Sequence, residues 1–116
     1  MYRGVRGAWM DNYIRKIYVP MSETAFYILF CLQNPQHGYG ISQEVKVMTA
    51  GEVTISPGTM YGTLSKMEKN GLICLLEEVD KRKIYQLTPL GKEVLALEIR
   101  RIHRLYQNSI GGEYHG

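Results

Sequence analysis

The sequence has little of the chemistry from which metal sites, disulfide scaffolds and membrane spans are built. Two cysteines among 116 residues, Cys31 and Cys74, are too few for a disulfide framework or a cysteine-rich metal site. The longest strongly apolar run, residues 25–32, is far shorter than the roughly 20 residues that a membrane-spanning helix needs. The amino-terminal residues lack the continuous apolar stretch of a secretory signal, so we expect a cytoplasmic protein with no membrane partner.

Signatures of catalysis are also scarce. No nucleophile stands in a recognisable pattern with a base, and no carboxylate cluster indicates a catalytic pocket. The stretch GTMYGT, residues 58–63, lacks the Gly-Lys-Ser/Thr ending of a phosphate-binding loop. His37 has no second metal ligand at a useful spacing and is interpreted as a hydrogen-bonding turn residue. We therefore predict that the protein is not an enzyme and that it binds no metal or other cofactor.

The positive charge is modest, and its placement along the chain is more informative than its size. A formal net charge of +3 permits binding to nucleic acid without requiring it. The densest basic cluster is the KRK run at residues 81–83, and a second basic run, RRIHR, occupies residues 100–104.

Helical periodicity, capping residues and β-compatible stretches divide the chain into five helices and one hairpin. The helices are predicted at residues 8–18, 23–33, 39–49, 57–70 and 89–109, and the hairpin at 73–87 with a charged tip at 80–82. Ser56 and Pro57 are typical of a helix start, and Gly71 of a left-handed helix end. The stretch EVTIS, residues 52–56, is read as a short strand. The predicted fold is mainly α with one β-hairpin.

The predicted helix at 57–70 has an unusual outward face. With residues about 100° apart, Met60, Leu64 and Met67 fall on one side and should face the core. The other side and its flanks carry glycines, hydroxyls and lysines: Gly58, Thr59, Tyr61, Gly62, Ser65, Lys66 and Lys69. Each interior glycine costs up to about 1 kcal/mol of helix stability relative to alanine. Small residues let a helix approach a DNA major groove, where hydroxyls and lysines bond phosphates and base edges; the alternative is an ordinary solvated face.

The hairpin that follows this helix carries the basic cluster at its tip. A helix-turn-helix followed directly by such a hairpin is a winged helix-turn-helix, with the helix at 39–49 as the positioning partner. Lys81, Arg82 and Lys83 could then reach phosphates or the adjacent minor groove. The alternative is a solvated hairpin tip.

Three motifs together resemble the PadR family of winged-helix transcriptional regulators. They are HGYGI at residues 37–41, SPGTMYGTLSKMEKNGLI at 56–73 and YQLTPLGKEVL at 85–95. Met60 departs mildly from the leucine that is usual there in the family. The resemblance implies a homodimeric repressor that binds operator DNA, with the helix at 57–70 in the major groove and the hairpin as the wing. The residues expected to contact DNA are Thr59, Tyr61, Gly62, Ser65, Lys66, Lys69, Lys81, Arg82 and Lys83.

The predicted last helix carries an apolar stripe wider than one hairpin can cover, which indicates a partner surface. The resemblance implies that this helix packs against its partner's copy and against the N-terminal helix. We expect Trp9, Tyr13, Leu95, Ile99, Ile102 and Tyr106 to form the dimer contact. The predicted segments are an N-terminal arm and helix at 1–21, a DNA-binding domain at 22–88, and a dimerisation helix and tail at 89–116. The alternative is that the last helix folds back over its own domain.

Two other functions remain open. One is a winged-helix module that binds another protein instead of DNA. The other is a repressor gated by a small aromatic effector at the dimer interface, with Trp9 either as part of that site or as a packing anchor. In the lead hypothesis, two-fold symmetry predicts a pseudo-palindromic operator.

Overall fold

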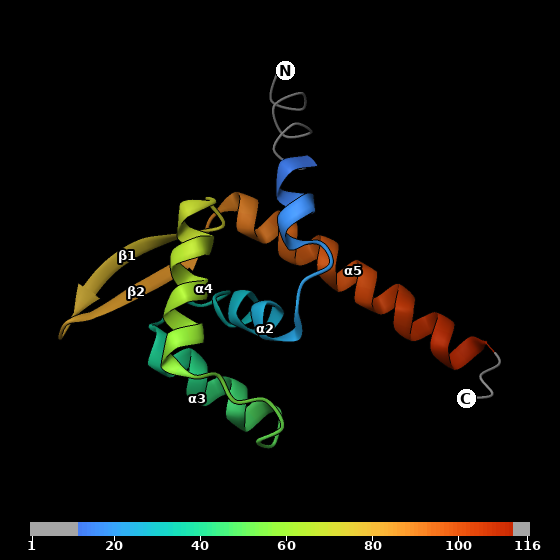
Figure 1. Cartoon of the computed structure of the whole chain (residues 1–116), viewed down its shortest axis with the longest axis horizontal. Coiled ribbons are helices and arrows are strands. Elements are labelled where there is room, and N and C mark those ends of the chain that lie inside the picture. Colours follow the sequence, from blue (N-terminus) through green and yellow to red (C-terminus); the bar gives the residue numbers. More distant parts are fainter. Residues whose placement is uncertain (1–11, 113–116) are drawn as a thin grey trace.

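The computed structural model describes residues 12–112, and within them the predicted order of helices and hairpin is confirmed (Figure 1). The first predicted helix is seen at residues 12–18. It is followed by α2 (Glu23–Cys31), α3 (Gly38–Met48), α4 (Pro57–Lys69), β1 (Ile73–Val79), β2 (Arg82–Leu87) and α5 (Pro89–Gly111). The hairpin of β1 and β2 extends away from the body beside α4 (Figure 1).

Side-chain caps begin the helices where the sequence indicates them. Ser22, Ser56 and Thr88 each accept a hydrogen bond from the backbone N–H three residues later, which satisfies a donor that has no partner within the helix. Pro57 occupies the first turn of α4. Gly71 follows the end of α4 with a φ of 81°, the left-handed conformation that favours glycine. The predicted caps of α4 are therefore confirmed at both ends.

The sheet is larger than a simple hairpin by one bridge. β1 and β2 pair antiparallel, with a bulge between Leu75 and Glu77. The two turn residues, Asp80 and Lys81, have φ values of 51° and 66°, and positive φ at both positions matches the twist of tight hairpins. Gln36, just before α3, exchanges two backbone hydrogen bonds with Tyr85 at 3.0 and 3.1 Å. This bridge fastens the base of the wing to the start of α3.

The strand predicted at residues 52–56 is wrong. Residues 53–56 form no strand, and the sheet of the described residues contains only β1 and β2. The backbone groups of this segment form hydrogen bonds with side chains of α3 and its C-cap instead. Ser42 Oγ donates to the Ile55 carbonyl at 3.1 Å, and Val53 N–H donates to Thr49 Oγ1 at 3.0 Å. Ile55 is buried in the core. The β-branched residues therefore anchor a loop.

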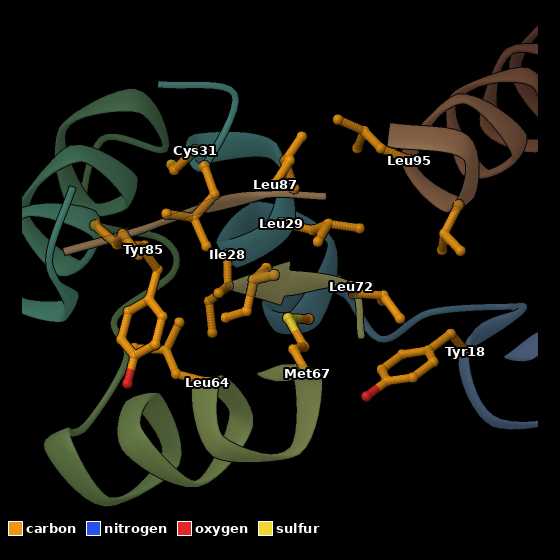
Figure 2. Packing of buried hydrophobic residues seen from close by; sticks show 14 of the residues in the cluster. Tyr18, Ile28, Leu29, Cys31, Leu64, Met67, Leu72, Tyr85, Leu87 and Leu95 are labelled. Atoms are coloured by element: carbon orange, nitrogen blue, oxygen red, sulfur yellow. The ribbon is translucent and has the colours of Figure 1, made fainter. Parts of the chain in front are cut away.

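One hydrophobic core joins all the elements. It contains Ile14 and Tyr18, Ile28 and Leu29 of α2, Ile41 and Val45 of α3, Met60, Leu64 and Met67 of α4, Tyr85 and Leu87 of β2, and Val94 and Leu95 of α5. Figure 2 shows Leu64 and Met67 pointing from α4 toward Ile28 and Leu29. The predicted core face of α4 is confirmed.

Cys31 behaves as the small buried hydrophobe that the sequence predicts. It is buried in the core, and burial together with the nearby Glu44 carboxylate raises the pKa of its thiol to about 12. The thiolate is the reactive form of cysteine, so this side chain stays protonated and unreactive at neutral pH.

The end of α4 and the start of α5 are tied together around Leu72. The Leu72 carbonyl accepts the Thr88 N–H at 3.0 Å, and Thr88 Oγ1 donates to the Gly71 carbonyl. Gly91, in the first turn of α5, lies so close to Leu72 that a Cβ at residue 91 would collide with the Leu72 carbonyl oxygen. The glycine of the TPLG motif is therefore required by this close approach.

The second half of α5 extends beyond the rest of the molecule (Figure 1). Ile99, Ile102 and Tyr106 are exposed there, and Tyr13 is exposed on the N-terminal helix. Leu95, which the sequence placed in the dimer contact, differs from this expectation. Only 4% of its surface is exposed, because it packs in the chain's own core and has little surface left for a partner. Trp9 lies outside the described residues.

Glu98 links α5 to the segment before α2. Its carboxylate is fully buried, accepts the Met21 N–H at 2.8 Å, and receives two bonds from Arg101 at 2.8 and 2.9 Å. Burial alone would raise the pKa of Glu98, but the bonds from Arg101 and Met21 outweigh it and lower that pKa below its usual 4.5. A buried charge with this many donors is a strong tether between two distant parts of the chain.

Replacing Glu98 with glutamine should lower the free energy of unfolding by about 2 kcal/mol at pH 7, because an amide group would then face the Arg101 donors. The lowered folded-state pKa means that the ionised carboxylate stabilises the fold above pH 4.5 and that this contribution disappears as the pH falls through the folded-state pKa. The difference in unfolding free energy between wild type and Glu98→Gln in urea should therefore shrink as the pH falls from 4.5 through the folded-state pKa. Glu93→Gln, on the exposed side of α5, is the control. If the unfolding free energies of wild type and Glu98→Gln differ by the same amount from pH 3 to pH 7, the role assigned to Glu98 is wrong.

Candidate nucleic-acid interface

The outward face of α4 is open along its whole length. Because Met60, Leu64 and Met67 are buried, the opposite side of the helix must face solvent. All six α4 residues expected to contact DNA are exposed: Thr59, Tyr61, Gly62, Ser65, Lys66 and Lys69. Tyr61 keeps 55% of its surface accessible, so its ring is available to a partner outside the monomer.

The two glycines of α4 are not required by packing. A Cβ built at Gly58 or Gly62 would meet no atom within 4 Å. At Gly38, by contrast, a Cβ would approach Met60 and Tyr61 to 3.0 Å, so that glycine permits α3 and α4 to pack closely. Gly62 therefore lowers the stability of α4, and no contact within the described structure requires a glycine there. Packing within the described residues therefore gives no reason for a glycine at this position.

The wing presents its basic side chains beside α4. Lys81, Arg82 and Lys83 are exposed at and just after the turn. With Tyr61 and Ser65 of α4 they line a cleft of about 410 Å³ between the helix and the hairpin. The predicted α4 and wing residues thus meet in one place, although Lys81 follows Ser65 by 16 positions in the sequence.

Arg82 lies against the start of α3. Its guanidinium lies over the ring of Tyr39, 5.2 Å from the ring centre, and its Nη1 lies 3.3 Å from His37 Nε2. The rings of His37 and Tyr39 are stacked with centres 6.4 Å apart. His37 also caps α3, accepting the Gly40 N–H on Nδ1 at 3.0 Å, so its predicted structural role is confirmed.

A second groove runs along the other flank of α4. It has a volume of about 480 Å³ and lies between Gly58, Gly62 and Lys66 on one side and the segment from Ile17 to Ala25 on the other. Lys66 Nζ lies 5.9 Å from the centre of the Tyr18 ring, and Asn70 Nδ2 donates to Tyr18 Oη at 3.0 Å. The exposed face of α4 is therefore a ridge between two grooves, one facing the wing and one facing the N-terminal segment.

Sequence reasoning placed α4 and the wing side by side but missed the contribution of α3. His37 and Tyr39 belong to the HGYG motif that carries part of the family resemblance. Nothing in the linear sequence shows that this motif lies against a wing residue 45 positions later. Lys69 is the one α4 residue of the predicted set that lines neither groove.

Other kinds of site find no support in the part of the chain that is described. Among residues 12–112, no three His, Cys, Asp or Glu side chains are grouped so that they could hold a metal ion. The helices of the same region are too short or too polar to cross a membrane.

The arrangement of α3, α4 and the β1–β2 hairpin defines a winged helix-turn-helix. Comparison with known proteins then gives the family. The chain belongs to the PadR-like family of transcriptional regulators, whose family model matches residues 28–97. This confirms the resemblance seen in the three motifs. Because the family consists of transcriptional regulators, it also agrees with the expectation of a protein that is not an enzyme.

Similar proteins support the assignment. The transcriptional regulator Rv3488 of Mycobacterium tuberculosis is 32% identical over 85 residues, which cover 71% of this chain and 77% of the relative. The structure of a transcriptional regulator from Clostridium thermocellum has a TM-score of 0.65 at 26% identity and covers 75% of this chain and 88% of the other. PadR of Bacillus subtilis, crystallised in complex with operator DNA, has a TM-score of 0.57 at 27% identity and covers 66% of this chain and 46% of that PadR.

Replacing Gly62 with alanine should raise the free energy of unfolding by about 0.5–1 kcal/mol, because alanine is the better helix former and its methyl group meets only open space. Gly38→Ala, in a helix of similar length, should lower stability because its methyl group would press on Met60 and Tyr61. Urea unfolding of the two variants beside wild type measures both effects. A loss of stability in Gly62→Ala would mean that the glycine has a structural role.

Proposed function

We propose that the protein is a sequence-specific transcriptional repressor that binds operator DNA as a homodimer in the cytoplasm, with α4 as the recognition helix. The observation that carries the proposal is the α4 ridge, on which an exposed glycine, a serine and a lysine stand between two grooves. A helix in a major groove is flanked by the two phosphate backbones, and grooves on both sides of α4 leave room for them. Thr59, Tyr61, Ser65 and Lys66 would contribute most of the recognition.

The wing supplies the second set of contacts in this proposal. Lys81, Arg82 and Lys83 carry three positive charges on a short hairpin that is fastened to the body through Tyr85 and Gln36. Charges on a fixed support lose less conformational entropy on binding than charges on a free loop. The operator complex of the related Bacillus subtilis PadR supports double-stranded DNA as the partner.

The exposed stripe of α5 supports a homodimer. Ile99, Ile102, Tyr106 and Ile110 recur at helical spacing and continue the line of the buried Leu95 along the same face. A contiguous apolar stripe of this kind on a projecting helix indicates an interface, and a second copy of the same stripe is its natural complement in a symmetric dimer. The two recognition helices would then read half-sites of a pseudo-palindromic operator, about 10 base pairs or a multiple of that apart.

A second candidate is regulation by a small aromatic effector. A groove of about 340 Å³ lies between α2 and α5 and is lined by Phe26, Tyr27 and Ile102, next to the surface proposed for the dimer. An effector bound there would alter how α5 meets its partner. In the operator-binding assay below, such a compound would lower the affinity of the protein for DNA without unfolding the protein.

Lys66→Ala and Tyr61→Ala should each weaken binding to the DNA upstream of the protein's own gene by about tenfold, since each removes contact with DNA from the exposed ridge. Fluorescence anisotropy with the footprinted fragment measures the affinity, and light scattering checks that the dimer persists. Wild-type affinity should fall steeply with salt, because neutralised phosphates release counterions.

Lys92→Ala is the matched control for Lys66→Ala, because Lys92 is exposed on α5 and both variants lose one positive charge. Unchanged affinity in both α4 variants would overturn the recognition-helix assignment. Absence of any footprint, with binding to a protein partner through the same face, would favour the protein-interaction module instead.

Ile102→Glu should convert the dimer into monomers, because it places a charge in the centre of the exposed stripe of α5. Arg104→Glu, also exposed but pointing about 200° away around the helix, should leave the dimer intact. Light scattering gives the molecular mass, and circular dichroism checks that α5 is retained. A dimeric Ile102→Glu protein would place the interface elsewhere.

A further inference from the structure

The contact between His37 and Arg82 is not a hydrogen bond, although His37 Nε2 and Arg82 Nη1 lie 3.3 Å apart. A backbone N–H can only donate, so the bond from Gly40 N–H requires the lone pair of His37 to be on Nδ1. The ring proton is then on Nε2. Arginine has no acceptor atom, and two N–H donors therefore face each other across this contact.

Two facing donors leave a place for an anionic acceptor. His37 and Arg82 both line the cleft between α4 and the wing, together with Lys81 and Lys83. None of the described residues that line this cleft is acidic; Asp80, in the adjacent turn, is not part of the lining. An oxygen that accepts from both donors would relieve the contact and partly neutralise three positive charges.

Arg82 is already oriented for such a ligand. Its guanidinium rests on the ring of Tyr39, and that ring is stacked on His37. A stacked guanidinium keeps its planar fork of donors in one orientation, which suits recognition of a phosphate. The ordering of this long side chain therefore precedes binding instead of opposing it.

We propose that His37 Nε2–H and the Arg82 guanidinium together hold one phosphate of the DNA backbone in the cleft between α4 and the wing. The inference rests on the proposed function and deepens it, because it assigns a phosphate contact to the first residues of α3, outside both the recognition helix and the wing. A phosphodiester fits this site because it is anionic and offers two free oxygens to two converging donors. The DNA strand on the wing side of α4 is the one that passes here.

Two variants each replace one of the two facing groups with a shorter, uncharged amide. His37→Asn keeps a strong N-cap for α3 but loses the imidazole N–H. Arg82→Gln keeps a planar polar side chain on the exposed wing but loses the charge. Each should weaken binding to the footprinted operator about five- to tenfold at 0.1 M salt, which is the effect of losing one phosphate contact. Urea unfolding should show the stability of both variants close to wild type.

The coupling between the two residues is the decisive measurement. Because both hold the same phosphate, the double variant should bind with a loss clearly smaller than the product of the two single losses. Operators that carry a neutral methylphosphonate at single positions locate that phosphate. At one position in each half-site, this neutral group should lower the affinity of the wild-type protein for the operator and leave the affinity of the double variant unchanged.

The remaining outcomes separate this site from the function on which it rests. Arg100→Gln, an equal change in charge on exposed α5, should bind as wild type does. Additive losses, or losses that no single methylphosphonate removes, would overturn the shared phosphate. Normal binding by His37→Asn beside weakened Lys66→Ala would overturn the inference and leave the recognition helix standing. Displacement of DNA by inorganic phosphate at constant ionic strength would assign the site to a free anion instead. A wild-type protein without DNA affinity would overturn both.

Discussion

The carbonyl oxygen of Leu72 occupies the space that any side chain at residue 91 would need, and much of the molecule depends on this close approach. Leu72 lies just beyond α4 and just before β1, while Gly91 lies in the first turn of α5. Thr88 bonds to the same carbonyl, to Gly71 and to Gly91. The end of α4, both ends of the wing and the start of α5 therefore meet at one crossing. Since each of these elements leaves the crossing in a fixed direction, α4 has little freedom to turn relative to α5.

Much of this fold is predictable because the information is local. The period of Met60, Leu64 and Met67 gives the orientation of α4, and hydroxyl caps with following prolines give the starts of α4 and α5. The exposed face of α4 follows from the buried one, so the predicted contact residues of this helix are all accessible. The wing follows in the same way from two β-compatible arms around a charged tip. Where a residue's role depends on its own helix or hairpin, the sequence is sufficient.

The rest depends on contacts between distant parts of the chain. Val53 and Ile55 alternate as in a strand, yet the hydrogen bonds of this segment are formed with Ser42 and Thr49. The periodicity of the sequence cannot show whether the backbone will pair with a strand or with side chains. Leu95 belongs by spacing to the same stripe as the exposed residues of α5, but only the packed structure shows where the chain's own core ends. The bond from Met21 to Glu98 spans 77 residues, and the approach of His37 to Arg82 spans 45. Tertiary packing alone creates these pairs.

The tether at Glu98 joins the two surfaces on which the proposed function depends. Met21, which Glu98 holds, forms part of the wall of the groove beside Gly62, while Glu98 itself lies one helical turn before Ile102 on α5. In the proposed dimer, a rotation of α5 would therefore act on the groove wall beside α4 through this one buried carboxylate. The crossing at Leu72 limits such a rotation at the other end of α5. Because α5 is held at both of these points, the packing of two copies of α5 in the proposed dimer would set the distance between the two α4 helices, and with it the spacing of the DNA half-sites that such a dimer could read.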